Sequence, residues 1–213
     1  MALVKLHHFS RSSASLRVRI ALAVKGIPYV PHSVNLAKAE HLHEEYGRDH
    51  PQHLVPVLSC EDGRSLVQSL AIIEYLEELY PDPPLLPADF YGRYYVRAIA
   101  QMIACEMHPL NNMRVVKRLR GGLNVDESLL EKEWTFHWLA AGFRSIESFL
   151  AREALHGEFC TGDQFTLADL CLFSQAFSAR RLGFSIESHA LLASVVKRCE
   201  ALPAIQLALS VSD

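Results

Sequence analysis

Four prolines fall within residues 81–87, the densest proline cluster of this 213-residue chain. Because proline fixes the backbone φ angle and has no amide hydrogen to donate, such a cluster excludes both a helix interior and a strand ladder. We therefore predict a linker at residues 83–90, between a first domain at 1–82 and a second at 91–213. The length is sufficient for two modest domains, each with its own core.

The residues before the linker alternate between strand and helix patterns. Gly26 is suited to end the first helix, and Pro56 belongs at the beginning or edge of a strand because it cannot donate to a ladder. Ser69 is expected to cap the last helix. The sequence predicts an α/β domain with strands at 3–9, 27–34, 54–58 and 65–67, and helices at 16–24, 38–46 and 69–79.

Beyond the linker the apolar spacing is helical almost throughout, which predicts an all-α second domain. His108-Pro109 interrupts the first long helix and should bend it. Thr166 and Asp169 have the spacing of a capping box, which we interpret as a folding feature without a catalytic role. The predicted helices are 91–119, 126–153, 166–181 and 189–202.

Composition narrows the functional class. Half of the residues are apolar and 21% are charged, which is typical of a folded enzyme. The net charge of −3 and its even spread do not suit nucleic-acid binding, and no apolar run reaches the roughly 18 residues of a membrane span. Five scattered cysteines indicate reduced thiols and a cytoplasmic protein. The histidine pairs lack the partners of a zinc site, so we expect no metal.

Three separated segments carry a family resemblance: RSSASLRVRIAL at 11–22, QSLAIIEYL at 68–76 and HPLNNMR at 108–114. Together they resemble the zeta class of glutathione transferases, which includes maleylacetoacetate and maleylpyruvate isomerases. The resemblance implies a thioredoxin-like first domain, an all-helical second domain and glutathione as cofactor. The class commonly has cysteine where this chain has Ala14, so a mechanism that depends on that thiol is not expected.

Ser12 and Ser13 are the candidate catalytic residues, since they lie where the first strand gives way to the first helix. A hydroxyl donor and the positive end of a helix dipole both lower the pKa of a nearby thiol. The resemblance implies that Ser12 donates a hydrogen bond to the glutathione sulfur and that Ser13 assists. The alternative is that both serines only cap the helix.

The first domain also carries the glutathione-binding candidates. Gln68 and Ser69 begin a helix whose N-terminus suits the γ-glutamyl carboxylate. The alternative for Ser69 is simple helix capping, which it can perform at the same time. The strand edge before Pro56 suits the extended cysteinyl backbone, with Val55 as the pairing residue. From the resemblance, Pro56 follows a cis bond, His41 and Gln52 lie near the glycyl end, His108 contacts glutathione, and Asn112 lies near the sulfur. A buried structural histidine is the alternative for His108.

The resemblance implies a dianionic substrate, whose carboxylates suit the fork geometry of arginine. The candidates are Arg11, Arg114 and Arg181, and we interpret Arg180 as a bystander. Most single arginines are surface residues or members of ion pairs, which is the alternative for each of them.

The implied activity is glutathione-dependent cis-trans isomerisation of maleylacetoacetate or maleylpyruvate in aromatic amino-acid or aromatic-acid degradation, by a cytoplasmic homodimer. One alternative is a broader glutathione transferase that conjugates or dehalogenates small electrophilic acids, and it differs by consuming glutathione. Another is a non-catalytic binding module with this fold. The serines and glutathione residues that such a module would have lost are all present.

Overall fold

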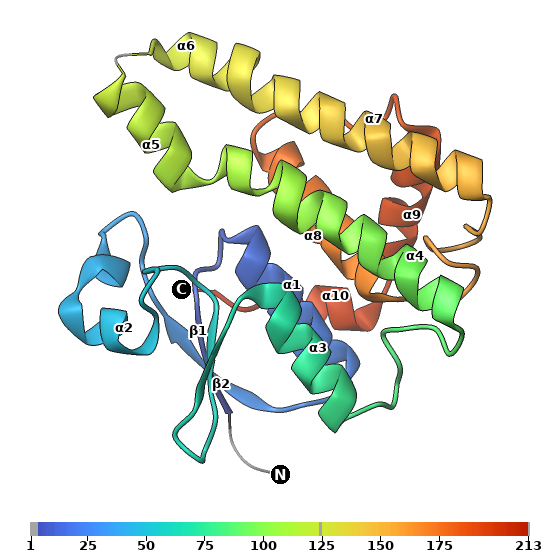
Figure 1. The fold of residues 1–213 in the computed structure, drawn as a ribbon, viewed down its shortest axis with the longest axis horizontal. Helices are drawn as coiled ribbons and strands as arrows, with labels where there is room; N and C mark the ends of the chain where they lie inside the picture. Colours follow the sequence, from blue (N-terminus) through green and yellow to red (C-terminus); the bar gives the residue numbers. More distant parts are fainter. Residues whose placement is uncertain (1–3, 124, 213) are drawn as a thin grey trace. The chain divides into compact units, whose positions relative to one another are not determined.

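The computed structural model describes residues 4–123 and 125–212. The chain forms two compact units (Figure 1). The first comprises Met1–Leu85 together with Glu200–Asp213, and the second comprises Leu86–Cys199. The predicted linker at 83–90 spans this division, whereas the last residues, predicted to belong to the helical domain, group with the first unit.

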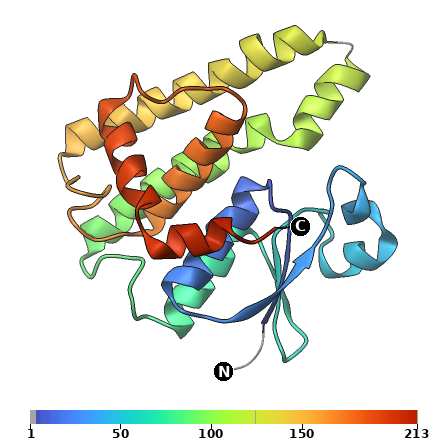
Figure 2. The ribbon, with the colours of Figure 1, turned by 180° about the vertical axis from the view of Figure 1, so that it is seen from behind.

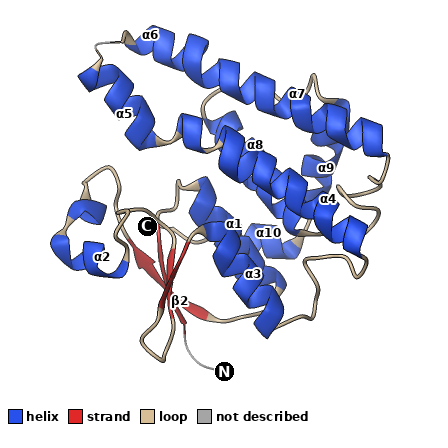
Figure 3. Ribbon diagram, viewed as in Figure 1, coloured by secondary structure: helices blue, strands red, loops and turns tan. Residues whose placement is uncertain are grey.

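A four-stranded mixed sheet forms the centre of the first unit (Figure 3). The strand order is β2-β1-β3-β4, with β1 parallel to β2 and antiparallel to β3. In this register His7 of β1 lies opposite both His32 of β2 and Val57 of β3. The strands are β1 (Val4–His8), β2 (Tyr29–Ser33), β3 (Val57–Ser59) and β4 (Ser65–Val67).

Helices α1 (Ser13–Val24) and α3 (Ser69–Leu79) lie on the same side of the sheet and pack against each other (Figure 3). Helix α10 (Pro203–Leu209) packs against α1, as Figure 2 shows for the red and blue helices. Ile205 of α10 is buried. Because α3 and α10 both cover α1, that helix is buried on nearly every side. Its buried side chains include Arg17 and Arg19.

The predicted helix at 38–46 is wrong as a single element. The structure has a 3-10 helix η1 (Glu40–Leu42) followed by α2 (Glu44–Asp49). Ala39 adopts a left-handed φ of 61° and His43 is extended, so the helical hydrogen bonds are interrupted on both sides of η1. Helix α10 was not predicted, and the last predicted helix ended at Leu202.

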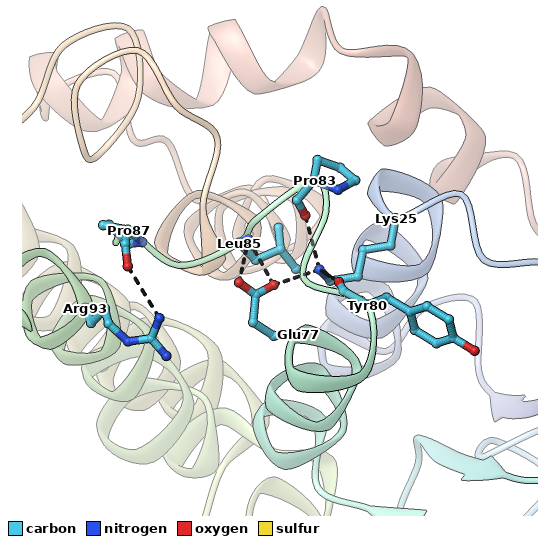
Figure 4. Close-up of polar contacts among 7 residues, drawn as sticks. All are labelled: Lys25, Glu77, Tyr80, Pro83, Leu85, Pro87 and Arg93. Carbon is cyan, nitrogen blue, oxygen red and sulfur yellow. Dashed lines mark hydrogen bonds and ion pairs between the residues drawn. The ribbon is translucent and has the colours of Figure 1, made fainter. Parts of the chain in front are cut away.

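A buried polar cluster fixes the end of the first unit (Figure 4). Lys25 Nζ donates to Glu77 Oε2 at 2.7 Å and to the carbonyl oxygens of Tyr80 (2.6 Å) and Pro83 (3.1 Å). The two Glu77 oxygens also accept from the amide of Leu85, at 3.1 and 3.0 Å. This cluster joins α1, α3 and the proline-rich segment.

The second unit is helical. Its first predicted helix is divided around Pro109, as the proline suggested. Near the start of this helix, Arg93 Nη1 donates to the carbonyl oxygen of Pro87 at 3.4 Å (Figure 4). Two segments have π-helical hydrogen bonding. The elements are α4 (Phe90–Gln101), η2 (Met102–Met107), η3 (Pro109–Asn111), α5 (Met113–Gly122), α6 (Glu127–Leu129), η4 (Leu130–Thr135), α7 (Phe136–Glu153), α8 (Leu167–Arg181) and α9 (Ala190–Glu200).

Helix α8 is the most buried helix of this unit, and its start shows the predicted capping box. The amide and hydroxyl of Thr166 both donate to Asp169 Oδ2, at 2.7 and 2.8 Å. Asp169 Oδ1 accepts from the amide of Cys160 at 2.7 Å. The predicted fold class, an α/β first domain followed by a helical one, is confirmed.

Among residues 4–123 and 125–212, no helix combines the length and the apolar character needed to cross a bilayer.

Candidate active site

The loop between β1 and α1 presents the two candidate serines. Ser12 is the N-cap of α1, and its Oγ accepts from the amide of Ser15 at 3.2 Å. Its own amide donates to the carbonyl oxygen of Phe9 at 3.0 Å. A hydroxyl that accepts one hydrogen bond still has its own proton to donate. Capping and donation to a ligand are therefore compatible roles for Ser12.

Ser13 is the first residue of α1 and is buried, whereas Arg11 beside the pair is exposed. Ser12 itself is half-buried. The sequence Arg11-Ser12-Ser13 thus places one exposed cation and two hydroxyls at the positive end of a twelve-residue helix. Such an end favours an anion.

Arg19 supports the loop between β1 and α1 by hydrogen bonding, a role that was not predicted from the sequence. The side chain is 2% exposed, and Nη2 donates to the carbonyl oxygen of Ser10 at 3.1 Å. Nη1 lies 3.3 Å from Nδ1 of His8. The signal available in the sequence was Arg19 itself, which with Arg17 interrupts the apolar residues Leu16, Val18 and Ile20 of the predicted helix.

The start of α3 differs from the prediction in one respect. Gln68 is the N-cap and Ser69 is the first helical residue, so Ser69 does not cap the helix. Gln68 has φ 69° and ψ 113°, a conformation that costs a non-glycine residue about 1–3 kcal/mol and is concentrated at functional sites. Ser69 is 7% exposed, and its Oγ accepts from Arg17 Nη1 at 3.4 Å.

Two glutamines join the start of α3 to the loop that precedes β3. The Nε2 atom of Gln68 donates to Oε1 of Gln52 at 2.6 Å, and both side chains are exposed. The structure therefore brings together two candidates that are 16 positions apart in the sequence.

Val55 is held in an apolar cluster with Phe9 and Val34, with Leu36 and Tyr46 packed against it. The hydroxyl of Tyr46 also donates to the carbonyl oxygen of Leu54 at 2.6 Å. The Val55–Pro56 bond is cis, as the resemblance implied. Through Phe9, the cluster fixes Val55 relative to the serine loop.

Histidines organise the rest of this region. His53 Nδ1 lies 2.7 Å from the carbonyl oxygen of His41, and a Cβ at Gly47 would lie only 2.5 Å from the His53 ring. His50 is buried, and its Nδ1 accepts from the amide of Gln52 at 3.3 Å. Burial lowers the pKa of His50, and the charge of His53 lowers it further. His53 therefore contacts the backbone of His41, and His50 contacts that of Gln52.

The remaining candidates belong to the second unit. His108 is half-buried before Pro109, and its amide donates to the carbonyl oxygen of Ile103 at 2.8 Å. Asn112 is the N-cap of α5, and its Oδ1 accepts from the amide of Arg114 at 3.1 Å. The side chains of Arg114 and Arg181 are exposed.

The predicted site residues of the first unit thus supply hydroxyls, amides and the N-termini of α1 and α3. None of these predicted residues carries a carboxylate. Such a surface suits a ligand with carboxylates and an ionisable thiol. The described residues contain no group of three or more histidine, cysteine, aspartate or glutamate side chains placed to hold a metal ion.

Comparisons with known proteins agree with this chemistry. Residues 6–84 match the family model of the glutathione S-transferase N-terminal domain. The chain is 43% identical to a maleylpyruvate isomerase of Ralstonia sp. over 205 residues, covering 96% of each protein.

Two solved structures are similar over nearly the whole chain. A holo maleylpyruvate isomerase, described as a bacterial zeta-class glutathione transferase, has a TM-score of 0.92 and 43% identity, and the match covers 96% of this chain and 95% of that one. A maleylacetoacetate isomerase of Methylobacterium extorquens AM1, solved with malonate and glutathione, has a TM-score of 0.92 and 35% identity at the same coverage.

Proposed function

This chain belongs to the zeta class of glutathione transferases, the family of the maleylacetoacetate and maleylpyruvate isomerases, and on that premise we propose that it isomerises such cis-unsaturated keto acids. It is a glutathione-dependent enzyme. The observation that carries the proposal is the β1–α1 loop, where Ser12 keeps a free hydroxyl proton at the N-terminus of α1.

The residues of the first unit fit glutathione. Ser69 and the N-terminus of α3 suit the γ-glutamyl carboxylate, and Gln68 lies beside them in a conformation that is costly without a functional reason. Val55 suits the cysteinyl backbone, with Pro56 following it, and His41 and Gln52 suit the glycyl end. In the second unit, His108 and Asn112 are the proposed further contacts.

The chemistry that bound glutathione supplies is reversible addition of its thiolate to the cis double bond, which permits rotation before the thiol is released. Ser12 donates a hydrogen bond toward the sulfur position, and the positive end of α1 adds to the stabilisation of negative charge there. Ser13 is buried in the first turn of α1, and its hydroxyl is the proposed assistant to Ser12 at this helix start. These fixed dipoles favour the thiolate without needing an acid-base residue.

The exposed guanidinium groups of Arg11, Arg114 and Arg181 are the proposed partners of the substrate carboxylates. Fork-shaped hydrogen bonding to a carboxylate both orients and binds it. Arg180 is half-buried, and its Nη2 pairs with Glu187 Oε1 at 3.5 Å. That pair supports its assignment as a bystander.

We also propose a homodimer in the cytoplasm. Helix α4 carries three exposed aromatic side chains, Phe90 (93% exposed), Tyr91 and Tyr94, and exposed aromatic clusters are typical of contacts between proteins. None of the five cysteines, all of which lie within the described residues, forms a disulfide, in agreement with a reducing compartment. Light scattering of the purified protein tests the dimer, and a monomer would contradict it.

The experiment that tests the activity supplies either maleylacetoacetate or maleylpyruvate in large excess over glutathione. Isomerisation should run to completion while the free thiol concentration returns to its starting value. Stoichiometric loss of the thiol would instead identify a conjugating enzyme, and no turnover of either acid would refute the proposed function.

A further inference from the structure

His53 joins two stretches of the first unit that carry the proposed contacts to the glycyl end of glutathione. Its ring Nδ1 lies 2.7 Å from the carbonyl oxygen of His41, 12 positions earlier in the chain. A carbonyl oxygen can only accept, so Nδ1 carries the proton of this hydrogen bond. Gln52 directly precedes His53. One side chain therefore links the stretch of His41 to the stretch of Gln52.

The backbone of His53 has a conformation that few residues with a side chain adopt. Its φ is 52°, in the left-handed region. This conformation is costly for a residue with a Cβ, and it persists where the surrounding structure fixes it. The amide of His53 donates to the carbonyl oxygen of His50 at 2.8 Å, and the ring donates to that of His41. These two hydrogen bonds hold His53 in its left-handed conformation.

Gly47 of α2 leaves room for the His53 ring. A Cβ at Gly47 would lie 2.5 Å from Cε1 of the ring and 2.9 Å from Nε2. The φ of Gly47 is not positive, so the missing Cβ, and not an unusual backbone conformation, is what distinguishes glycine at this position. The ring is therefore packed directly against the backbone of α2.

A second hydrogen bond joins the same two stretches further along. The hydroxyl of Tyr46 donates to the carbonyl oxygen of Leu54 at 2.6 Å. Because this bond does not involve His53, the two stretches remain attached when the histidine ring is removed. The ring contact therefore adjusts how His41 and Gln52 are spaced, and its loss can be studied in a folded protein.

We propose that His53 is a positioning residue for the glycyl carboxylate of glutathione, since its ring holds His41 and Gln52 at the spacing that lets both contact that group. The inference rests on the proposed glutathione contacts of these two residues and goes beyond them by naming the side chain that sets their spacing. His53 acts through its two neighbours and takes no part in the chemistry at the sulfur.

The test compares glutathione with γ-glutamylcysteine, which lacks only the glycine. Calorimetry gives the dissociation constant of each ligand, and the readout is the ratio of the two constants for each protein. A substitution that only loosens the fold weakens both ligands alike, because they share the γ-glutamyl and cysteinyl groups. In the wild type, glutathione should bind about thirtyfold more tightly, as expected for hydrogen bonds to one carboxylate.

Two substitutions of His53 separate the ring contact from the backbone conformation. Glycine accepts the left-handed φ but has no side-chain donor, so His53→Gly should lower the ratio by about fivefold. Asparagine also tolerates this φ, and its amide nitrogen lies near the position of Nδ1 and can donate to His41. His53→Asn should therefore keep the ratio within about twofold of the wild-type value.

Gly47→Ala disturbs the same contact from the opposite side. The added methyl group displaces the His53 ring, so the ratio should again fall by about fivefold. In the His53→Gly protein there is no ring to displace, and the further change Gly47→Ala should alter the ratio by less than about twofold. If one of the two single variants does not fold, the other one decides the matter.

His43→Gln is the matched control, because His43 is an exposed histidine beside α2 whose side chain makes no capping hydrogen bond. Its ratio should stay within about twofold of the wild-type value. A wild-type ratio near one, an unchanged ratio in both His53→Gly and Gly47→Ala, or equal losses in His53→Gly and His53→Asn would overturn the inference. The expected ratios in a protein that turns over neither keto acid would support this inference while refuting the proposed isomerase activity.

Discussion

The Nζ atom of Lys25 lies 2.7 Å from Oε2 of Glu77, and both side chains are almost completely shielded from solvent. The same carboxylate accepts the amide of Leu85, so one buried pair joins two helices to the segment that leaves the first unit (Figure 4). Removing one member of such a pair leaves an uncompensated buried charge.

Lys25→Met should therefore lower the free energy of unfolding by about 3–5 kcal/mol, because Glu77 would keep its charge without its partner. Urea unfolding followed by circular dichroism measures this. Glu44→Gln is the control, since the Glu44–Arg48 pair is 3.6 Å apart and largely exposed, and it should leave stability nearly unchanged. Equal effects of the two substitutions would contradict a stabilising role for the buried pair.

Ser12→Ala should raise the pKa of bound glutathione and slow isomerisation by about 10- to 1000-fold, as expected for loss of one donor to a developing anion. Thiolate absorbance in the ultraviolet reports the pKa directly. The substitution also removes a helix cap, so Ser12→Thr serves as the control because it keeps both the cap and the hydroxyl. An unchanged pKa and rate in Ser12→Ala would remove Ser12 from the catalytic assignment.

Replacing Gln68 separates binding from folding. Gln68→Gly suits the positive φ better, so the free energy of unfolding should change by less than about 1 kcal/mol. Affinity for glutathione should nevertheless fall by about tenfold, because the substitution removes the side chain that contacts Gln52 and that we propose to contact the γ-glutamyl group. Unchanged affinity by calorimetry would show that Gln68 does not bind glutathione.

Arg181→Met should reduce kcat/KM for the dianionic keto acid by about ten- to a hundredfold, while glutathione affinity and activity toward a neutral electrophile remain nearly intact. Arg180→Met is the matched control, because Arg180 is the neighbouring arginine in the sequence and itself pairs with Glu187. Equal losses toward charged and neutral substrates would indicate that Arg181 is structural.

His50 should make the loop at residues 50–55 sensitive to acid. Its pKa is lowered in the folded protein, chiefly by burial, so the unfolded chain takes up a proton first as the pH falls below about 6.5. Stability should therefore decline below that pH and level off below the folded-state pKa. In His50→Asn, whose amide oxygen can still accept from Gln52, urea unfolding should show a smaller decline. An identical pH profile would exclude His50 as the cause.

The alternation of strands and helices before the proline cluster was readable because each element carries its own period and end signals. The candidate site could be predicted mainly where neighbouring residues share one helix start, as Ser12 and Ser13 do. The contacts of Arg17 with Ser69 and of Arg19 with Ser10 depend on tertiary packing, and no local sequence pattern predicts them. The positive φ of Gln68 was not predicted either, because positive φ is expected of glycine. The neighbouring Ser69 suggested an ordinary helix cap instead.

Helix α10 is the last helix to be synthesised, but it belongs to the first unit. The ribosome delivers the sheet first and α10 last, yet α10 covers α1 beneath the serine loop. The unit that holds the serines is therefore interrupted by the whole of the second unit and is closed only by the final residues. A chain that ended before Pro203 would lose the packing of α10 against α1, the helix that begins at the candidate catalytic serines.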